Sequence, residues 1–202
     1  MKRADHLTNP SDAELVSRAQ RSDPAAFSEL VKRYQDRVYN TCYRMCHNHE
    51  DALDLTQSAF LKALEALPRF ELRAEFFTWL FRIAVNLTLS HRRAQSRRPT
   101  LALRQFDDEQ DRPFDPPATN DSDDPARRVA RVELRQRLEA ALEKLDEEFR
   151  AAVVLRDIEE LDYATIAEIL EVPAGTVKSR IHRGRLMLRE MLQQEEPQLG
   201  IG

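Results

Sequence analysis

The stretch "LDYATIAEILEVPAGTVKSRIHRGRLMLREML", residues 161–192, predicts a short helix, a tight turn and a second, basic helix. The turn falls at residues 171–173, and the second helix starts near Ala174. At 100° per residue, one side of this second helix carries Val177, Ile181, Gly184 and Leu188. The opposite side carries Ser179, His182, Arg183 and Leu186. Two helices joined in this way are typical of a helix-turn-helix, with the first of these sides facing the core.

Positive charge is concentrated in the second helix, although the chain has 31 Lys and Arg against 35 Asp and Glu. The exposed N-terminal part of such a helix enters the major groove, where Arg and Lys donate to guanine and flanking cations meet phosphates. The candidate DNA-binding residues are Thr176, Lys178, Ser179, Arg180, His182, Arg183 and Arg185. The alternative is a solvated, charge-rich surface helix. The inward Gly184 favours the helix-turn-helix, because it suits a helix packed closely on its partner.

The first 98 residues read as successive helices. Ser11 and Glu14 form a capping box, and Asp23 followed by Pro24 starts a second helix. A third helix is expected over about residues 50–67, ended by Pro68, and a fourth from about Ala74 to Arg98.

Residues 99–128 interrupt this pattern. Prolines stand at positions 99, 113, 116, 117 and 125, and eight acids lie between Asp107 and Asp124. This composition predicts a flexible acidic linker. Helical periodicity returns at Val129, with an apolar stripe made of Leu134, Leu138, Ala141, Leu142 and Leu145. Asp146 is expected to cap the next helix. The predicted fold is all-α, with an N-terminal domain (1–98), the linker and a four-helix helix-turn-helix domain (129–202).

A second nucleic-acid surface is expected on the fourth helix. An outward polar stripe there holds Arg82, Asn86, Arg93 and Arg97, and Arg92 and Arg98 add charge. Aromatic rings beside basic charge suit single-stranded bases, and four precede the stripe: Phe70, Phe76, Phe77 and Trp79. Phe77 and Trp79 are expected in the core, since large aromatics are usually mostly buried. For Phe70 and Phe76 both roles stay open.

The third helix offers a different kind of face. Ala52, Ala59, Phe60 and Ala63 can be buried. Asp54, Gln57, Ser58 and Leu61 lie together on another side. An acid, an amide and an exposed leucine suit a protein partner better than DNA.

Several classes of function find no support in the sequence. The most apolar stretch, residues 76–89, is too short and too charged to span a bilayer, and the N-terminus has no apolar signal core. The chain is therefore expected to stay in the cytoplasm without membrane insertion. The motif "CYRMCHNH" (42–49) lacks the spacing of a standard zinc finger. No cofactor, metal or catalytic group is expected.

Together these segments resemble the bacterial sigma factors of RNA polymerase, most closely the extracytoplasmic-function class (group IV). "DALDLTQSAFLKALEALPRF" (51–70) is similar to that family's core-polymerase-binding helix. "FFTWLFRIAVNLTLSHRR" (76–93) is similar to its minus-ten-recognition helix, and residues 161–188 to its minus-thirty-five-reading helix-turn-helix. The order of the motifs and the acidic linker agree as well.

The resemblance implies a non-catalytic initiation subunit. Asp54, Gln57, Ser58 and Leu61 would dock on core RNA polymerase. Phe76, Arg82, Asn86, Arg92 and Arg93 would lie at the minus-ten element. Lys178, Ser179, His182 and Arg183 would read the minus-thirty-five element of promoter DNA, although many relatives carry Arg at the place of Lys178 and an aromatic at that of His182. An anti-sigma factor is a further implied partner. The alternative functions are a stand-alone helix-turn-helix regulator and a DNA-binding adaptor.

Overall fold

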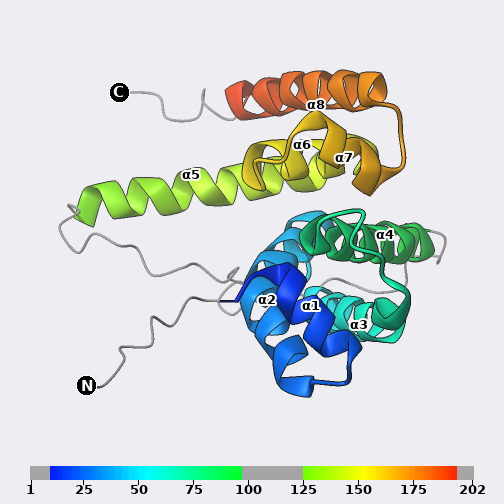
Figure 1. Ribbon diagram of the computed structural model, residues 1–202. Coiled ribbons are helices and arrows are strands. Elements are labelled where there is room, and N and C mark those ends of the chain that lie inside the picture. The colour runs from blue at the N-terminus through cyan, green and yellow to red at the C-terminus, as the bar shows by residue number, and fades with distance from the viewer. Residues whose placement is uncertain (1–9, 97–124, 195–202) are drawn as a thin grey trace, which may run out of the picture.

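The computed structural model describes residues 10–96 and 125–194, and side chains over 10–95 and 129–194. The N-terminal half contains α1 (Asp12–Gln20), α2 (Pro24–Cys46), α3 (His49–Ala66) and α4 (Phe76–Ser96), with a 3-10 turn at Leu67–Arg69. Figure 1 shows the long α2 with α1, α3 and α4 around it. The predicted order of helices is confirmed. The fourth begins two residues later than the expected start at Ala74, and Arg97 and Arg98 lie outside the described residues.

Side-chain caps fix the starts of these helices. Ser11 and Glu14 form the predicted capping box at α1. Asp23 accepts hydrogen bonds from the amides of Ala25 and Ala26, which caps α2 ahead of Pro24. Asn48 caps α3 in the same way, accepting from the amide of Asp51.

The C-terminal half contains α5 (Pro125–Lys144), α6 (Glu147–Val153), the π-helix η2 (Val154–Ile158), α7 (Tyr163–Leu170) and α8 (Ala174–Gln194). Helix α5 begins earlier than the sequence pattern indicated, so 125–128 are helical rather than part of the linker. A proline fits here because the first helical residue has no intrahelical partner for its amide. Asp146 occupies the N-cap position of α6, but its side chain makes no capping hydrogen bond. Residues 97–124, with most of the predicted linker, lie outside the described part.

The apolar stripe predicted on α5 is only partly buried. Ala141, Leu142 and Leu145 form a small core with Val153, Val154 and Leu188. Leu134 is 59% exposed, however, and Leu138 is 36% exposed. Figure 1 shows the reason, because the N-terminal part of α5 projects beyond the other helices. Periodicity identifies an apolar face, but it does not show how far the neighbouring helices extend along that face.

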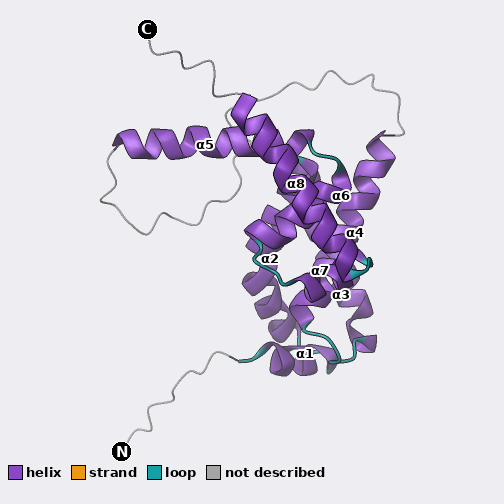
Figure 2. Cartoon of the chain, turned by 90° about the horizontal axis from the view of Figure 1, so that it is seen from above, coloured by secondary structure: helices purple, strands orange, loops and turns teal. Residues whose placement is uncertain are grey.

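The two halves pack against each other. Buried residues of α2 and α4 share one apolar cluster with Ala152, Leu155 and Ile166 of the C-terminal half. In Figures 1 and 2, α7 lies over the N-terminal half and α8 crosses on the outer side. The composition of the linker gave no indication of this contact.

Arg150 of α6 joins the halves through its guanidinium group, and its side chain is among the largest that are fully buried. It donates to the carbonyl oxygens of Leu142 and Leu145 at 2.7 and 2.6 Å, and of Met45 in α2 at 2.8 Å. Burial and the nearby Arg92 lower the pKa of Arg150 to about 10, so the side chain stays charged at neutral pH. A cation at the C-terminal ends of α2 and α5 is well placed, because unpaired carbonyls gather there.

Candidate nucleic-acid interface

The helix-turn-helix predicted from residues 161–192 is present. Asp162 caps α7 by accepting from the amides of Ala164 and Thr165, and these hydrogen bonds hold its pKa below the ordinary value. Glu171 ends α7 in the left-handed conformation, with φ of 54°. All four residues predicted to face inward from α8 are buried: Val177, Ile181, Gly184 and Leu188.

Gly184 marks the closest approach of α8 to α6. A Cβ placed on it would lie 2.6 Å from Cγ2 of Val153 and 3.4 Å from Cβ of Phe149. The absence of a side chain therefore lets α8 lie close against α6, as expected from the sequence.

The outward face of α8 is open to solvent. Lys178, Ser179, His182 and Arg183 are all exposed, and the hydroxyl of Ser179 donates to the carbonyl of Thr176 at 2.9 Å. The sequence pattern placed Ser179, His182 and Arg183 on the outward side, and Lys178 was among the candidate DNA-binding residues. They form one continuous surface near the start of the helix, which is the part that a major groove admits.

Two other basic residues of α8 have carboxylate partners. Arg180 donates to Oε2 of Glu148 at 2.6 Å, and Arg185 pairs with Asp157. The hydrogen bond that Arg185 donates to the carboxylate of Asp157 raises the pKa of Arg185. Both cations thus help to hold α8 against α6 and η2, and each ion pair would have to loosen before the guanidinium met a phosphate.

The candidates on α4 are in three different environments. Arg82 and Arg93 are exposed, whereas Asn86 is half-buried. Arg92 lies at the junction of the halves, where Nη1 is 3.5 Å from the carbonyl oxygen of Cys46 and Nε is 3.8 Å from Oε1 of Glu147. Its side chain is only 17% exposed, so Arg92 does not present its charge outward in this conformation.

The aromatic residues before this stripe belong mainly to the core. Phe76 is 2% exposed and Phe70 is 8% exposed, and their rings contact each other and Trp79. Phe77 is buried, as expected, and Trp79 is half-buried. In this conformation Phe70 and Phe76 therefore pack in the core, and neither ring has a free face on which a base could stack.

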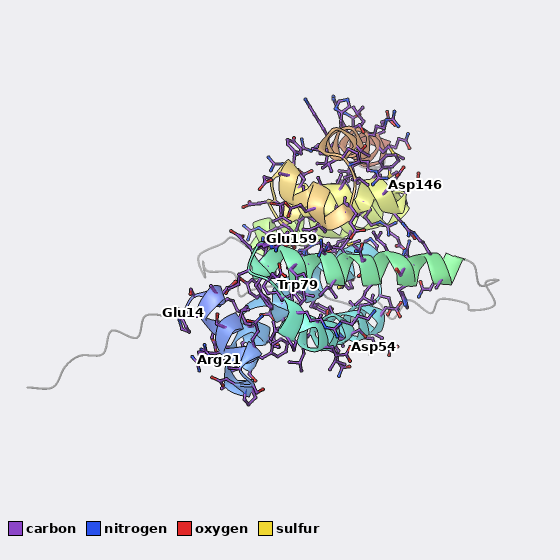
Figure 3. All side chains as sticks on the ribbon, turned by 45° about the vertical axis from the view of Figure 1, so that its right-hand side comes forward. Glu14, Arg21, Asp54, Trp79, Asp146 and Glu159 are labelled. Atoms are coloured by element: carbon purple, nitrogen blue, oxygen red, sulfur yellow. The ribbon has the colours of Figure 1, made fainter. Side chains whose placement is uncertain are left out.

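A separate surface lies on α3. Asp54, Gln57 and Leu61 are exposed and Ser58 is half-buried, while the four residues predicted for the buried side are buried. Asp54, Gln57 and Leu61 line a groove of about 440 Å³ between α2 and α3. Its apolar members are Phe27, Val31, Leu53, Phe60, Leu61 and Leu64. Figure 3 shows Asp54 on the side of the N-terminal half away from the C-terminal helices. Leu53 and Leu64 were not predicted as part of this face, although their helical spacing with Leu61 was the available signal.

The "CYRMCHNH" segment does not form a cluster of open ligands. Cys42 and Cys46 are buried free thiols, and burial raises their pKa values to about 11 and about 12. His49 shares a hydrogen bond of 2.7 Å with the hydroxyl of Tyr39. Among the described residues there is no group of three His, Cys, Asp or Glu placed to hold a metal ion. Within the same residues, no helix is both long and apolar enough to cross a membrane.

Comparison with known families matches both halves of the chain. Residues 30–98 match Sigma-70 region 2, and residues 135–188 match Sigma-70, region 4. The first match covers most of α2, all of α3 and all of α4. The second covers the last half of α5, all of α6, η2 and α7, and α8 as far as Leu188.

Curated relatives cover nearly the whole chain. The chain is 37% identical over 187 residues to the RNA polymerase sigma-H factor of Pseudomonas aeruginosa, with 93% of this chain and 96% of the relative covered. It is 35% identical to the ECF RNA polymerase sigma factor SigW of Bacillus subtilis, with 88% and 94% covered. It is 39% identical to the ECF RNA polymerase sigma-E factor of Escherichia coli, with 87% and 91% covered.

Solved structures share the fold. CnrH in complex with the cytosolic domain of CnrY matches with a TM-score of 0.67 and 25% identity, over 92% of this chain and 99% of CnrH. The sigma factor RpoE of Bartonella quintana matches with a TM-score of 0.61 and 24% identity, over 83% and 96% of the two chains. The chain therefore belongs to the extracytoplasmic-function family of RNA polymerase sigma factors, whose members direct the polymerase to promoters.

Proposed function

We propose that α8 reads the minus-thirty-five element and α4 the minus-ten element of the promoters to which this sigma factor directs RNA polymerase. The observation that carries the first assignment is the outward surface of Lys178, Ser179, His182 and Arg183 on a helix held close to α6 by Gly184. Arg183 is the strongest base-reading candidate among them, because a guanidinium offers a bidentate fork to guanine. Arg180 and Arg185 flank this surface as phosphate contacts.

The assignment to α4 rests on Arg82, Asn86 and Arg93, which keep exposed or partly exposed side chains on one helix. A base that is flipped out of the stack needs polar partners for its edge, and Asn86 can supply both a donor and an acceptor. Arg92 joins this surface only when its contacts with Cys46 and Glu147 are released.

The groove on α2 and α3 is the proposed docking surface for core RNA polymerase. Exposed leucines beside Asp54 and Gln57 combine apolar area with hydrogen-bonding groups, as protein interfaces require. The groove lies on a different side of the molecule from the reading face of α8, so both can be engaged at once.

An anti-sigma factor is a proposed partner as well. The solved structure of CnrH, which shares the fold, is a complex with the cytosolic domain of CnrY. A comparable partner would cover the polymerase-binding or DNA-binding surfaces of this chain until it is removed.

The chain is proposed to act as a non-catalytic subunit, in the cytoplasm with the polymerase that it serves, and to need no metal or cofactor.

The acidic stretch 107–124 lies outside the described residues. It stays a proposal that these acids mimic nucleic acid in a basic channel of the polymerase. Neutralising the eight acids at constant length should then weaken holoenzyme assembly or change abortive synthesis.

A reconstitution tests the function directly. The purified chain is mixed with sigma-free core polymerase on fragmented genomic DNA, and the 5′ ends of the transcripts are mapped. Discrete starts that share two spaced upstream elements support the proposal. If folded protein free of inhibitor gives no specific starts, an operator-binding regulator or a DNA-binding adaptor becomes the better description.

A further inference from the structure

Glu159 is a charged residue that the function described so far does not use, and it is 5% exposed at the junction of the two halves. Its carboxylate accepts from Nε of Arg37 at 2.7 Å and from the hydroxyl of Thr41 at 2.8 Å, both in α2. Its own carbonyl accepts from Nη2 of Arg37 at 2.8 Å. Figure 3 shows Glu159 between the C-terminal helices and the N-terminal half.

The backbone around Glu159 departs from regular helix. The amide of Glu159 donates to the carbonyl of Val154 at 3.0 Å, which is the i to i−5 pattern of a π-helix. Glu160 follows with φ of 56°, an unusual conformation for a residue with a side chain. Single-turn π segments occur frequently at functional sites. Here the irregular turn points the carboxylate of Glu159 at α2.

Arg37 belongs to the N-terminal half on its other side. Its guanidinium carbon lies 4.3 Å from the ring centre of Phe77 in α4, so α2, α4 and η2 meet around this one cation. The side chain of Arg37 is already 45% exposed, so it can keep the ring contact and water once the halves separate. Glu159 would lose every partner named above. Thr41, which is 1% exposed, would keep an acceptor inside α2, because the carbonyl oxygen of Arg37 lies 2.9 Å from its hydroxyl.

The closed arrangement is incompatible with reading two promoter elements at once. Elements named for positions minus-ten and minus-thirty-five lie about 25 base pairs apart, which is roughly 80 Å along B-DNA. A compact chain of this length has a radius of gyration of about 17 Å. The halves must therefore separate on the promoter, and α4, which packs on α7 here, must lose that contact.

We propose that Glu159, Arg37 and Thr41 form a polar lock that holds the free chain closed, with the halves together and the promoter-reading surfaces unable to act jointly. Arg150 reinforces the lock through the carbonyl of Met45. Buried ionic contacts often add less stability than specificity, because removing charge from water is costly, and this suits a contact that must open. The regulatory part of the inference rests on the proposed function.

The affinity of the chain for core polymerase depends on the fraction of molecules that are open. The groove on α2 and α3 is exposed in the closed chain, but a polymerase that reads both promoter elements must hold the halves apart. If the final complex contains only the open chain, its apparent dissociation constant is the intrinsic one divided by the open fraction. Loss of a hydrogen bond to a charged group changes such an equilibrium by about tenfold or more. A weakened lock therefore raises the affinity for core polymerase by about the same factor.

Two variants weaken the lock from opposite sides, Glu159→Gln and Thr41→Val, and each nearly preserves the shape of the side chain. Glu160→Gln is the matched control, since it makes the same chemical change one residue later at an exposed position. Full-length chains carry one dye on α2 and one on α8, at Lys32→Cys and Glu190→Cys, both exposed positions. Single-molecule energy transfer then counts open molecules, and a titration with core polymerase gives the affinity.

If the lock exists, both variants should contain about tenfold more open molecules, seen as molecules with low energy transfer. Both should also bind core polymerase more tightly. Glu160→Gln should show neither change. Unchanged transfer in both variants, with circular dichroism showing native helix content, would overturn the lock. More open molecules without tighter binding would overturn its regulatory role. If the wild-type chain does not bind core polymerase at all, the proposed function fails, while the transfer measurement still decides whether the lock exists.

Discussion

The position of α8 against α6 depends on the absence of a Cβ atom at Gly184. Gly184→Ala places a methyl group against Val153 in a packed core, and such overpacking costs about 1–3 kcal/mol. We expect a lower unfolding midpoint in urea and weaker promoter-specific transcription, because α8 must move away from α6. Gly175→Ala is the control, since a Cβ there meets nothing within 4 Å and alanine favours helix by up to about 1 kcal/mol. Equal stability of the two variants would contradict the proposed close approach.

Arg183 is the residue on which the reading assignment can be tested most simply. Arg183→Ala should lower promoter-specific transcription by an amount that corresponds to about 1–3 kcal/mol, the range for a bidentate contact to guanine. Binding to core polymerase should not change. Arg189→Ala removes the same charge from an exposed position further along α8 and serves as the control. Loss of the same size in both variants would point to general charge rather than base reading.

Among the helices, α7 has a cap whose effect depends on pH. The carboxylate of Asp162 accepts two amide hydrogen bonds, which lower its pKa from the ordinary value of 3.8. Its stabilising effect is therefore complete above that value and is lost as the pH falls through the lowered pKa. Asp162→Ala should lower the thermal midpoint at pH 7, and the difference from the wild type should shrink below pH 3.8. A difference independent of pH would mean that the cap acts without its charge.

The groove beside α3 gives a prediction for binding alone. Asp54→Ala combined with Gln57→Ala should weaken the complex with core polymerase at least tenfold while the thermal midpoint stays within a few degrees, because both side chains are exposed. Asp36→Ala, an exposed acid on α2 outside the groove, should have no effect. Unfolding of the double variant, or unchanged affinity, would contradict the assignment of this groove.

The helices were predicted well because their caps and buried faces are determined by residues that lie close together in the sequence. The capping box at Ser11, the cap at Asp23 and the buried face of α8 each follow from residues within a few turns of one another. The exposed half of the α5 stripe was not predictable in this way. Its burial depends on the lengths of other helices, and a periodic pattern carries no such information.

The arrangement of the two halves was the main feature that sequence reasoning did not provide. Glu159 and Arg150 lie more than 100 positions from their partners in α2, and nothing in their local sequence distinguishes them from surface residues. A flexible linker is compatible with many arrangements, so the one adopted depends on complementary groups that only the fold brings together. For the same reason Arg92 was expected on a DNA-facing surface, although it lies at the junction.

At the scale of the whole molecule, charge predicts weak binding of the free chain to DNA. The net charge is −4, so the chain as a whole does not attract a polyanion. We expect weak, steeply salt-dependent association, with log K falling by about 0.9 per phosphate contact for each unit of log salt. Fluorescence anisotropy with a labelled duplex at several salt concentrations measures this slope. Tight binding that ignores salt would mean that the chain reads DNA without the polymerase.

The burial of Cys42 and Cys46 has a consequence for how the protein meets oxidants. With pKa values of about 11 and about 12, roughly one thiol in ten thousand or fewer is ionised at pH 7. Peroxides and disulfides react with the thiolate, so both sulfur atoms should stay reduced through an oxidative challenge that modifies exposed cysteines. In the closed chain, these two thiols would therefore not act as a redox switch, even though they stand only four residues apart.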